Sequence, residues 1–238
     1  MAGSDTELPT RAPRGSRRRP DLPPPRAEKI RPRSGMSRAE VIADQRRRIL
    51  YGLAAALAYH GYEDTKITDI VELAAISRPT FYEHFEGKEQ CFAAAYEDGV
   101  ERLTAAVGTA AAGHPDWEGR LAAGLGAGLE FLAADPSLAH LLLVESLAAA
   151  RPARLEHERS LARLAEALRA PVDELPDGVR PISPQTARLL AGGIASHLSG
   201  LLLAGEADRL PDSHALLLDY LLVPSLPGAA RSADERRA

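Results

Sequence analysis

The chain has 238 residues, of which 45% are apolar and 26% are charged, and its formal net charge is −4. This length and apolar share are sufficient for a folded protein with a substantial core. A single cysteine, Cys91, excludes a disulfide framework or a thiolate metal cluster. No uncharged run reaches the roughly 20 apolar residues of a membrane span, and no apolar stretch follows the N-terminal arginines as in a secretory signal. We therefore expect a soluble, cytoplasmic protein without a membrane segment.

The first 35 residues are basic and rich in proline. They contain nine Lys/Arg, four Asp/Glu and seven prolines, with few large apolar side chains. Such a segment cannot bury enough surface to offset its conformational entropy, so we predict a disordered basic arm over residues 1–35. Two roles fit this arm: non-specific attraction to nucleic-acid phosphates, or a solvated extension without a function.

From Met36 onward the hydrophobic pattern is helical. Apolar residues recur at three- and four-residue steps, and no segment alternates as a strand does. The first predicted helix, 37–59, ends before Gly61 and places four aliphatic residues on one stripe: Ile42, Ile49, Leu53 and Leu57. Further helices are predicted over 66–74, 78–85, 88–112, 117–134, 136–149, 152–170, 184–204 and 213–222. The expected fold class is all-α, with an N-terminal domain over 36–90, a helical domain over 91–224 and a flexible tail over 225–238.

Residues 66–85 have the pattern of two short helices joined by a tight turn. Ser77 is a good N-cap for the second helix, and Pro79 is tolerated in its first turn. Ile76 before the cap and Phe81 after it have the spacing of a hydrophobic staple, and Phe85 continues the same inward face. Backed by the long first helix, this is a helix-turn-helix, whose second helix enters a DNA major groove.

Two cations occur at helix N-termini, where the helix dipole disfavours positive charge. Arg78 is in the first turn of the second short helix, and Lys88 begins the next helix. This placement favours an external anion such as a phosphate or a guanine edge. The alternative is that Lys88 pairs with Glu83 or Glu86 while Arg78 is simply solvated.

The segments 61–71 and 75–89 resemble the DNA-binding region of TetR-family transcriptional regulators. The most specific part is the string Tyr82-x-His84-Phe85-x-x-Lys88 that follows the Ser77 cap. The sequence departs from the family pattern at two positions. Ala75 replaces the usual turn glycine, and Lys66 stands where a small hydroxyl residue often caps the helix, so we expect Thr65 to take that role.

The resemblance implies a role for each residue of this region. Contacts to base edges are implied for Arg78, Pro79 and Thr80. Contacts to phosphates are implied for Thr65, Lys66, Thr68, Ser77, Tyr82, His84 and Lys88. The alternative for Tyr82 and His84 is packing within the small domain, and Phe81 and Phe85 are expected to be core residues.

The resemblance also implies that the C-terminal helices bind a ligand and form a homodimer. The candidate dimer interface consists of Gly192, Ser196, Gly200, Leu201, Leu217 and Leu221, although these residues could instead pack within one chain. The candidate ligand pocket consists of Tyr96, Trp117, Phe131, His140, Glu145 and His197. The alternative for each pocket residue is an ordinary core position, or an exposed position for Glu145. Cys91 is interpreted as a small core residue rather than a redox sensor.

The predicted function is that of a transcriptional regulator, typically a repressor, which a small-molecule inducer releases from an inverted-repeat DNA operator. No cofactor, metal or membrane partner is expected, and the protein should be cytoplasmic at the nucleoid. Two other classes stay open: an enzyme, for which no phosphate loop, HExxH or G-x-S-x-G motif is present, and a helix-turn-helix used for protein contact or general nucleoid binding.

Overall fold

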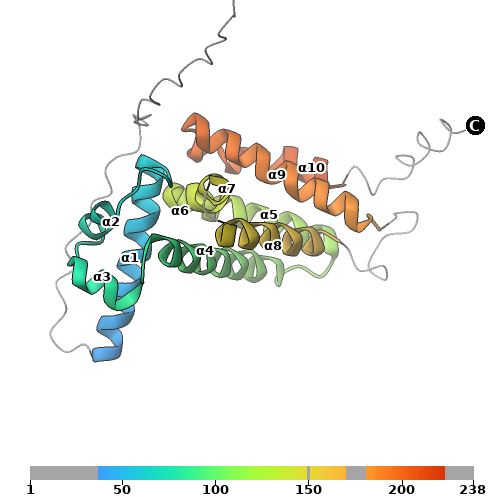
Figure 1. The fold of residues 1–238 in the computed structure, drawn as a ribbon. Coiled ribbons are helices and arrows are strands. Elements are labelled where there is room, and N and C mark those ends of the chain that lie inside the picture. Colours follow the sequence, from blue (N-terminus) through green and yellow to red (C-terminus); the bar gives the residue numbers. More distant parts are fainter. Residues whose placement is uncertain (1–36, 149–150, 170–180, 223–238) are drawn as a thin grey trace, which may run out of the picture.

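The structure, a computed structural model, describes residues 37–148, 151–169 and 181–222. The predicted arm over 1–35 and tail over 225–238 lie outside these residues. Every regular element in the described part of the chain is helical, which confirms the all-α class. Three N-terminal helices gather at one end of the molecule, and the remaining helices form an elongated bundle beside them (Figure 1).

The long first helix, α1 (Arg38–His60), anchors the N-terminal group. Ser37 and Glu40 form a reciprocal capping box, and Gly61 ends the helix at φ 78°, a conformation that favours glycine. Three members of the predicted stripe are buried, but Ile42 is 47% exposed. The first two turns of α1 therefore extend beyond the core, and burial begins only at Ile49.

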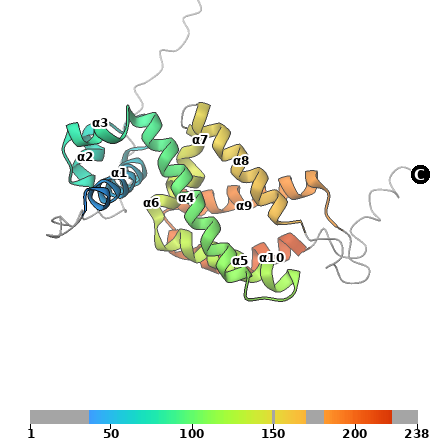
Figure 2. The same ribbon diagram turned by 90° about the horizontal axis from the view of Figure 1, so that it is seen from below.

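The two short helices, α2 (Ile67–Ala74) and α3 (Arg78–His84), pack against α1 as the predicted helix-turn-helix (Figure 2). The expectation that Thr65 caps α2 is wrong, because the N-cap is Lys66, whose backbone N–H donates to the Asp69 carboxylate at 2.8 Å. Ala75 ends α2 in the left-handed region at φ 50° and ψ 47°. The turn thus keeps the geometry for which glycine is preferred, although its residue carries a Cβ.

The C-terminal bundle begins with α4, which leads away from the N-terminal helices. Its elements are α4 (Lys88–Ala111), α5 (Trp117–Ala134), α6 (Pro136–His140), η1 (Leu141–Glu145), α7 (Ser146–Ala148), α8 (Arg151–Ala167), α9 (Pro184–Ala204), the short 3₁₀ turns η3 (Ala207–Arg209) and η4 (Pro211–Ser213), and α10 (His214–Leu222). α4 packs on both α1 and α5, so it joins the two groups of helices.

The predicted continuous helix over 136–149 is interrupted. Residues Leu141–Glu145 adopt π-helical geometry between α6 and α7. Ser199 of α9 donates its hydroxyl to the Leu143 carbonyl at 3.0 Å, and the Ser146 hydroxyl donates to the Leu142 carbonyl at 2.8 Å. These side chains satisfy carbonyl groups where the helix changes its pitch, a feature that periodicity does not encode.

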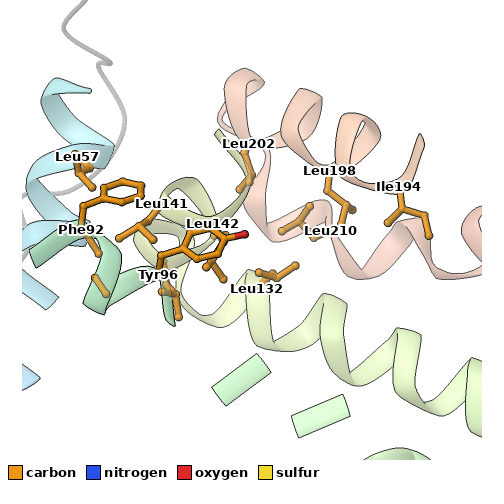
Figure 3. Close-up of a cluster of buried hydrophobic side chains, with 14 of the residues drawn as sticks. Leu57, Phe92, Tyr96, Leu132, Leu141, Leu142, Ile194, Leu198, Leu202 and Leu210 are labelled. Carbon is orange, nitrogen blue, oxygen red and sulfur yellow. The ribbon is translucent and has the colours of Figure 1, made fainter. Parts of the chain in front are cut away.

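One continuous apolar core runs through both groups of helices. Figure 3 shows Leu57 of α1 beside Phe92 of α4, with Leu141 and Leu142 of η1 next to them and Leu202 of α9 beyond. The N-terminal helices are therefore attached to the bundle by shared side-chain packing as well as by the chain.

The helix α9 is both long and apolar, with 21 residues and a mean hydropathy of 1.3 over 18 of them. By these two criteria alone it could cross a membrane, and α5 joined to Pro136–Glu145 passes the same test despite a bend of 106°. However, Leu190, Ile194 and Leu198 of α9 are buried against the rest of the bundle. We therefore interpret α9 as a core helix of the bundle, with one apolar face left uncovered in the protomer.

Candidate nucleic-acid interface

The helix α3 is held by its inward face and exposes its N-terminal head. The Ser77 hydroxyl accepts the Thr80 backbone N–H at 3.2 Å, as predicted for an N-cap. Phe81 is fully buried and Phe85 nearly so, which confirms both as core residues. Because these contacts fix the rotation of α3, the side chains of its first turn face away from the core.

Arg78 and Tyr82 form a pair on this exposed surface. The Arg78 guanidinium lies 5.7 Å from the centre of the Tyr82 ring and donates to its hydroxyl at 3.3 Å. Tyr82 is 47% exposed. The pairing holds the planar guanidinium of Arg78, with its five N–H donors, beside the Tyr82 hydroxyl at the N-terminal end of α3. Such an arrangement is suited to contacts with base edges and phosphates.

His84 and Thr80 are more enclosed than the other predicted contact residues of α3. The His84 Nε2 donates to the Gln45 side-chain oxygen of α1 at 3.1 Å, so this ring joins the two helices. The Thr80 hydroxyl lies 2.8 Å from that of Ser77. Both residues are half-buried. In the free protein they orient α3 on α1, which agrees with the packing alternative for His84.

The residues at the start of α2 divide into exposed and buried members. Lys66 and Thr68 are both exposed. Thr65, by contrast, is only 2% exposed, and its hydroxyl donates to the Gly61 carbonyl at 2.7 Å. A phosphate contact by the Thr65 side chain does not fit this position, because the hydroxyl is committed to the loop that connects α1 and α2.

Lys88 is enclosed by the same loop. Its amine donates to the carbonyl oxygens of Tyr62 and Thr65, the latter at 2.9 Å, and lies 4.4 Å from the centre of the Tyr62 ring. Burial lowers the pKa of Lys88, while Asp64, Glu89 and Glu63 raise it. The cation therefore finds its partners within the protein, in backbone carbonyls rather than in the acidic residues considered from the sequence.

Arg48 of α1 is a structural residue that the sequence pattern did not single out. Its guanidinium donates through Nε to the Ala74 carbonyl at 2.9 Å, and also to the Ala75 carbonyl. The C-terminal end of α2 and the left-handed turn residue are thus both held by one side chain. The only signal in the sequence is the basic run 46–48, which does not distinguish this arginine from its neighbours.

The sequence of this N-terminal region matches a known protein family. Residues 49–95 match the family described as bacterial regulatory proteins, tetR family. This N-terminal region is therefore of the tetR-family type. The family consists of regulators, which agrees with the prediction that the chain is not an enzyme.

One curated relative is similar over a quarter of the chain. An uncharacterized HTH-type transcriptional regulator, YdgC of Bacillus subtilis, is 34% identical over 60 residues. The match covers 25% of this chain and 31% of the relative. The chain therefore spans less than a third of the length of that relative.

Solved structures share the fold over most of the chain. FadR from Bacillus halodurans has a TM-score of 0.65 at 18% identity, covering 79% of this chain and 96% of that one. FadR from Bacillus subtilis has a TM-score of 0.62 at 17% identity and covers 74% and 96%. SmeT, the repressor of a Stenotrophomonas maltophilia efflux pump, has a TM-score of 0.60 at 24% identity and covers 78% and 96%. The helical C-terminal bundle thus also has the fold of these regulators.

The six predicted pocket residues are distributed over the bundle. His140 donates from Nε2 to the Leu202 carbonyl at 3.1 Å, and the His197 Nε2 lies 2.9 Å from the Ser213 hydroxyl. Trp117 is buried at the start of α5, whereas Phe131 carries the Arg102 guanidinium over its ring at 5.5 Å. Three of these side chains thus have a specific partner within the bundle, and Trp117 is buried in it.

Glu145 lies at the boundary between the bundle and the N-terminal helices. The alternative that it is an exposed residue is wrong, because it is only 5% exposed. Its Oε2 accepts the backbone N–H of Tyr62 at 2.8 Å. This carboxylate therefore contacts the loop between α1 and α2, and its observed partner is the protein backbone.

Tyr96, the sixth predicted pocket residue, belongs to a buried polar cluster with two residues that the sequence did not indicate. The His157 Nδ1 lies 3.3 Å from the Tyr96 hydroxyl and 3.1 Å from the Ser146 hydroxyl. Burial is the largest effect that raises the pKa of Tyr96 and lowers that of His157. His157 was missed because it lies in a strongly charged stretch of α8, and the polarity of its neighbours hides its inward position.

A cavity of about 240 Å³ lies between α8 and α9, at a different place from the predicted pocket. It is lined by Ala162, Ala165, Glu166, Arg169, Pro184, Gln185 and Arg188. None of the six predicted residues belongs to it.

Cys91 is fully buried, and burial raises the pKa of its thiol to about 12, so at neutral pH it is a protonated core residue.

The predicted dimer residues divide between the core and the surface. Leu217 and Leu221 are each 3% exposed and pack within the protomer, so the prediction that they face a partner is wrong. A Cβ added to Gly192 or Gly200 would meet nothing within 4 Å, and Ser196 is exposed. The exposed apolar residues near this ridge are Leu189, Leu203, Leu216 and Tyr220, and Leu201 is half-buried beside the core.

Proposed function

We propose that this protein is a sequence-specific DNA-binding transcriptional regulator that reads an inverted repeat. The single observation that carries the proposal is the exposed head of α3 in a TetR-type domain, where Arg78, Pro79 and Tyr82 all face away from the core. In this proposal Arg78, Pro79 and Thr80 meet base edges. Lys66, Thr68 and Tyr82 contact phosphates, with Ser77 and His84 at the edge of the same surface.

The regulator acts as a homodimer in this proposal, through the uncovered face of α9 and α10. Glycine and serine at 192, 196 and 200 allow another helix to approach closely, and Leu189, Leu203 and Leu216 supply apolar contacts around them. In this proposal, a two-fold axis through this face presents two copies of α3 to one DNA duplex. Two-fold symmetry is the reason for expecting an inverted repeat with half-sites separated by about 34–36 Å or a multiple of it.

The proposed mode of action is repression that a small molecule relieves in the cytoplasm. Support comes from the fold of the bundle: the FadR structure from Bacillus subtilis is a complex with stearoyl-CoA, and SmeT is described as a repressor. Of the predicted pocket residues, Tyr96 is the one we retain for the ligand. Its hydroxyl, with Ser146 and His157, forms a polar group within an otherwise apolar part of the bundle.

The test is selection of bound duplexes from random DNA with the full-length protein. The proposal expects enrichment of one inverted repeat, and loss of binding to it when a compound from a panel that includes acyl-CoA esters is added. Enrichment of no motif would instead support general nucleoid binding or a protein-contact role. A panel compound that is consumed would revive the enzyme alternative.

A further inference from the structure

The backbone of Tyr62 is held from both sides by charged side chains of the other group of helices. Its N–H donates to the Glu145 carboxylate at 2.8 Å, and its carbonyl accepts from the Lys88 amine. The same amine lies over the Tyr62 ring. Glu145 comes from η1 in the bundle, so its contact crosses from the C-terminal domain to the N-terminal one, and Lys88 is the first residue of α4, the helix that joins the two groups.

Tyr62 lies in the loop between α1 and α2, so the contacts of its backbone affect the position of α2 and of α3 after it. It follows Gly61, the residue that ends α1, and lies five residues before Ile67 at the start of α2. Between them, Thr65 binds back to Gly61, and Lys88 also binds the Thr65 carbonyl. The loop 61–66 is therefore a compact, internally bonded segment, and a displacement at Tyr62 is passed on to α2.

Glu145 is itself rigidly placed. It is the last residue of the π-helical turn η1, whose carbonyls at 142 and 143 are bound by Ser146 and by Ser199 of α9. The wider turn changes the direction of the side chains that follow α6, and it leaves Glu145 buried and facing Tyr62. Ser199 links this turn to α9, the helix that carries the proposed dimer face.

We infer that Glu145 is a positioning residue for DNA binding: by holding Tyr62 against Lys88, it fixes the orientation of α2 and α3 from within the C-terminal domain. This inference rests on the proposed function. Any change in the bundle that shifts η1 reaches the DNA-reading helix through this contact. Glu145 thereby serves the regulation of DNA binding rather than direct recognition of a ligand.

The first experiment measures DNA affinity of Glu145→Ala, Glu145→Gln and wild type at several salt concentrations, on the duplex that wild type selects. Glu130→Ala, which removes an exposed carboxylate from α5, is the matched control. We expect Glu145→Ala to bind about tenfold more weakly with an unchanged salt slope, since a charged hydrogen bond is lost but no phosphate contact. Glu145→Gln, which keeps an oxygen acceptor, should retain most of the affinity, and Glu130→Ala should match wild type.

The direction of this effect is decisive. Removing an acidic side chain near a DNA-binding domain cannot weaken its attraction to phosphates, so an electrostatic account predicts equal or tighter binding. Equal or tighter binding by Glu145→Ala would overturn the inference. The double variant Glu145→Ala/Lys88→Met should be non-additive, because both side chains act on the same residue, whereas additive losses would also contradict the inference.

Amide hydrogen exchange without DNA provides a test that does not depend on the proposed function. In Glu145→Ala the amides of Tyr62 and α2 should exchange faster than in Glu130→Ala, while those of α5 stay unchanged. Unchanged exchange at Tyr62 and α2 would overturn the inference. If wild type selects no duplex at all, the proposed function fails, and the exchange result still decides whether Glu145 holds the loop.

Discussion

Single residues in the N-terminal domain show how local chemistry replaces the usual family pattern. Ala75 adopts φ 50° at the end of α2, and its carbonyl and that of Ala74 are bound by Arg48. An L-residue in this conformation is disfavoured by about 1–2 kcal/mol relative to the right-handed region. The arginine contact therefore stabilises a turn whose own residue is not the best one for it.

Replacing Ala75 by glycine tests this interpretation at the residue scale. We expect Ala75→Gly to raise the free energy of unfolding by about 0.5–1 kcal/mol, because the relief of backbone strain exceeds the added chain entropy. The comparison variant is Ala105→Gly at an exposed position of α4, which should lower stability by about 1 kcal/mol. Denaturant unfolding of both variants measures the difference, and equal destabilisation would show that Ala75 carries no strain.

At the scale of elements, the contact between α1 and α2 depends on one glycine. A Cβ at Gly52 would lie 2.8 Å from the Ala74 nitrogen and 2.8 Å from the Ile70 oxygen, both of which are backbone atoms. Backbone cannot move aside as a flexible side chain can. The close approach of these two helices therefore requires that Gly52 has no side chain.

The corresponding prediction is that Gly52→Ala destabilises the protein by about 1–3 kcal/mol. Gly108→Ala in α4 is the matched control, because a Cβ there meets nothing within 4 Å, and it should stabilise the helix by about 0.5–1 kcal/mol. Thermal unfolding distinguishes the two, with opposite shifts in Tm. A Gly52→Ala protein as stable as wild type would mean that α1 and α2 do not pack this closely.

A second element-scale prediction concerns α8, which His157 attaches to α4 and α7. Burial lowers the pKa of His157 below its ordinary value of 6.5, so the folded state disfavours its protonation. As the pH falls below about 6.5, the unfolded chain takes up a proton that the folded chain resists, and stability is lost. We expect His157→Gln to flatten this pH dependence in denaturant titrations. An unchanged slope between pH 7 and 5 would contradict the assignment.

Helical periodicity and punctuation predicted most elements to within one or two residues, including the turn between α2 and α3 and the core role of Phe81. These sequence patterns did not predict the features that depend on contacts between distant parts of the chain. The π-helical turn at 141–145 depends on hydroxyls from elsewhere in the chain, and the inward direction of His157 is hidden among charged neighbours. Likewise, the carbonyl partners of Lys88 lie more than 20 residues away in sequence, so spacing along the helix could not reveal them.

At the scale of the whole molecule, the uncovered face of α9 requires an occupant, and a second copy of the chain is the one we propose. Leu189 and Leu203 of this face are 75% and 57% exposed. We expect Leu203→Glu and Gly200→Phe to produce monomers in sedimentation experiments, because a charge or a bulky ring separates the two helices.

The control for dimerisation is Leu155→Glu on α8, which changes a leucine that is 49% exposed outside the proposed interface. It should sediment as wild type does. If Leu203→Glu and Gly200→Phe keep the wild-type sedimentation coefficient, the dimer face lies elsewhere. Loss of the dimer should also weaken binding to the inverted repeat, since each half-site is then bound independently.

In the proposed dimer two copies of α3, one from each protomer, provide specificity, and we propose that Arg78 is the residue that contacts a base. The most direct test is the affinity of wild type and Arg78→Ala for a panel of single-base operator variants at several salt concentrations. Loss of Arg78 should cost about 1–3 kcal/mol on the preferred site and remove discrimination at one base position in each half-site. If Arg78→Ala instead weakens binding uniformly and every base preference persists, Arg78 does not read a base and the proposed role of α3 is wrong.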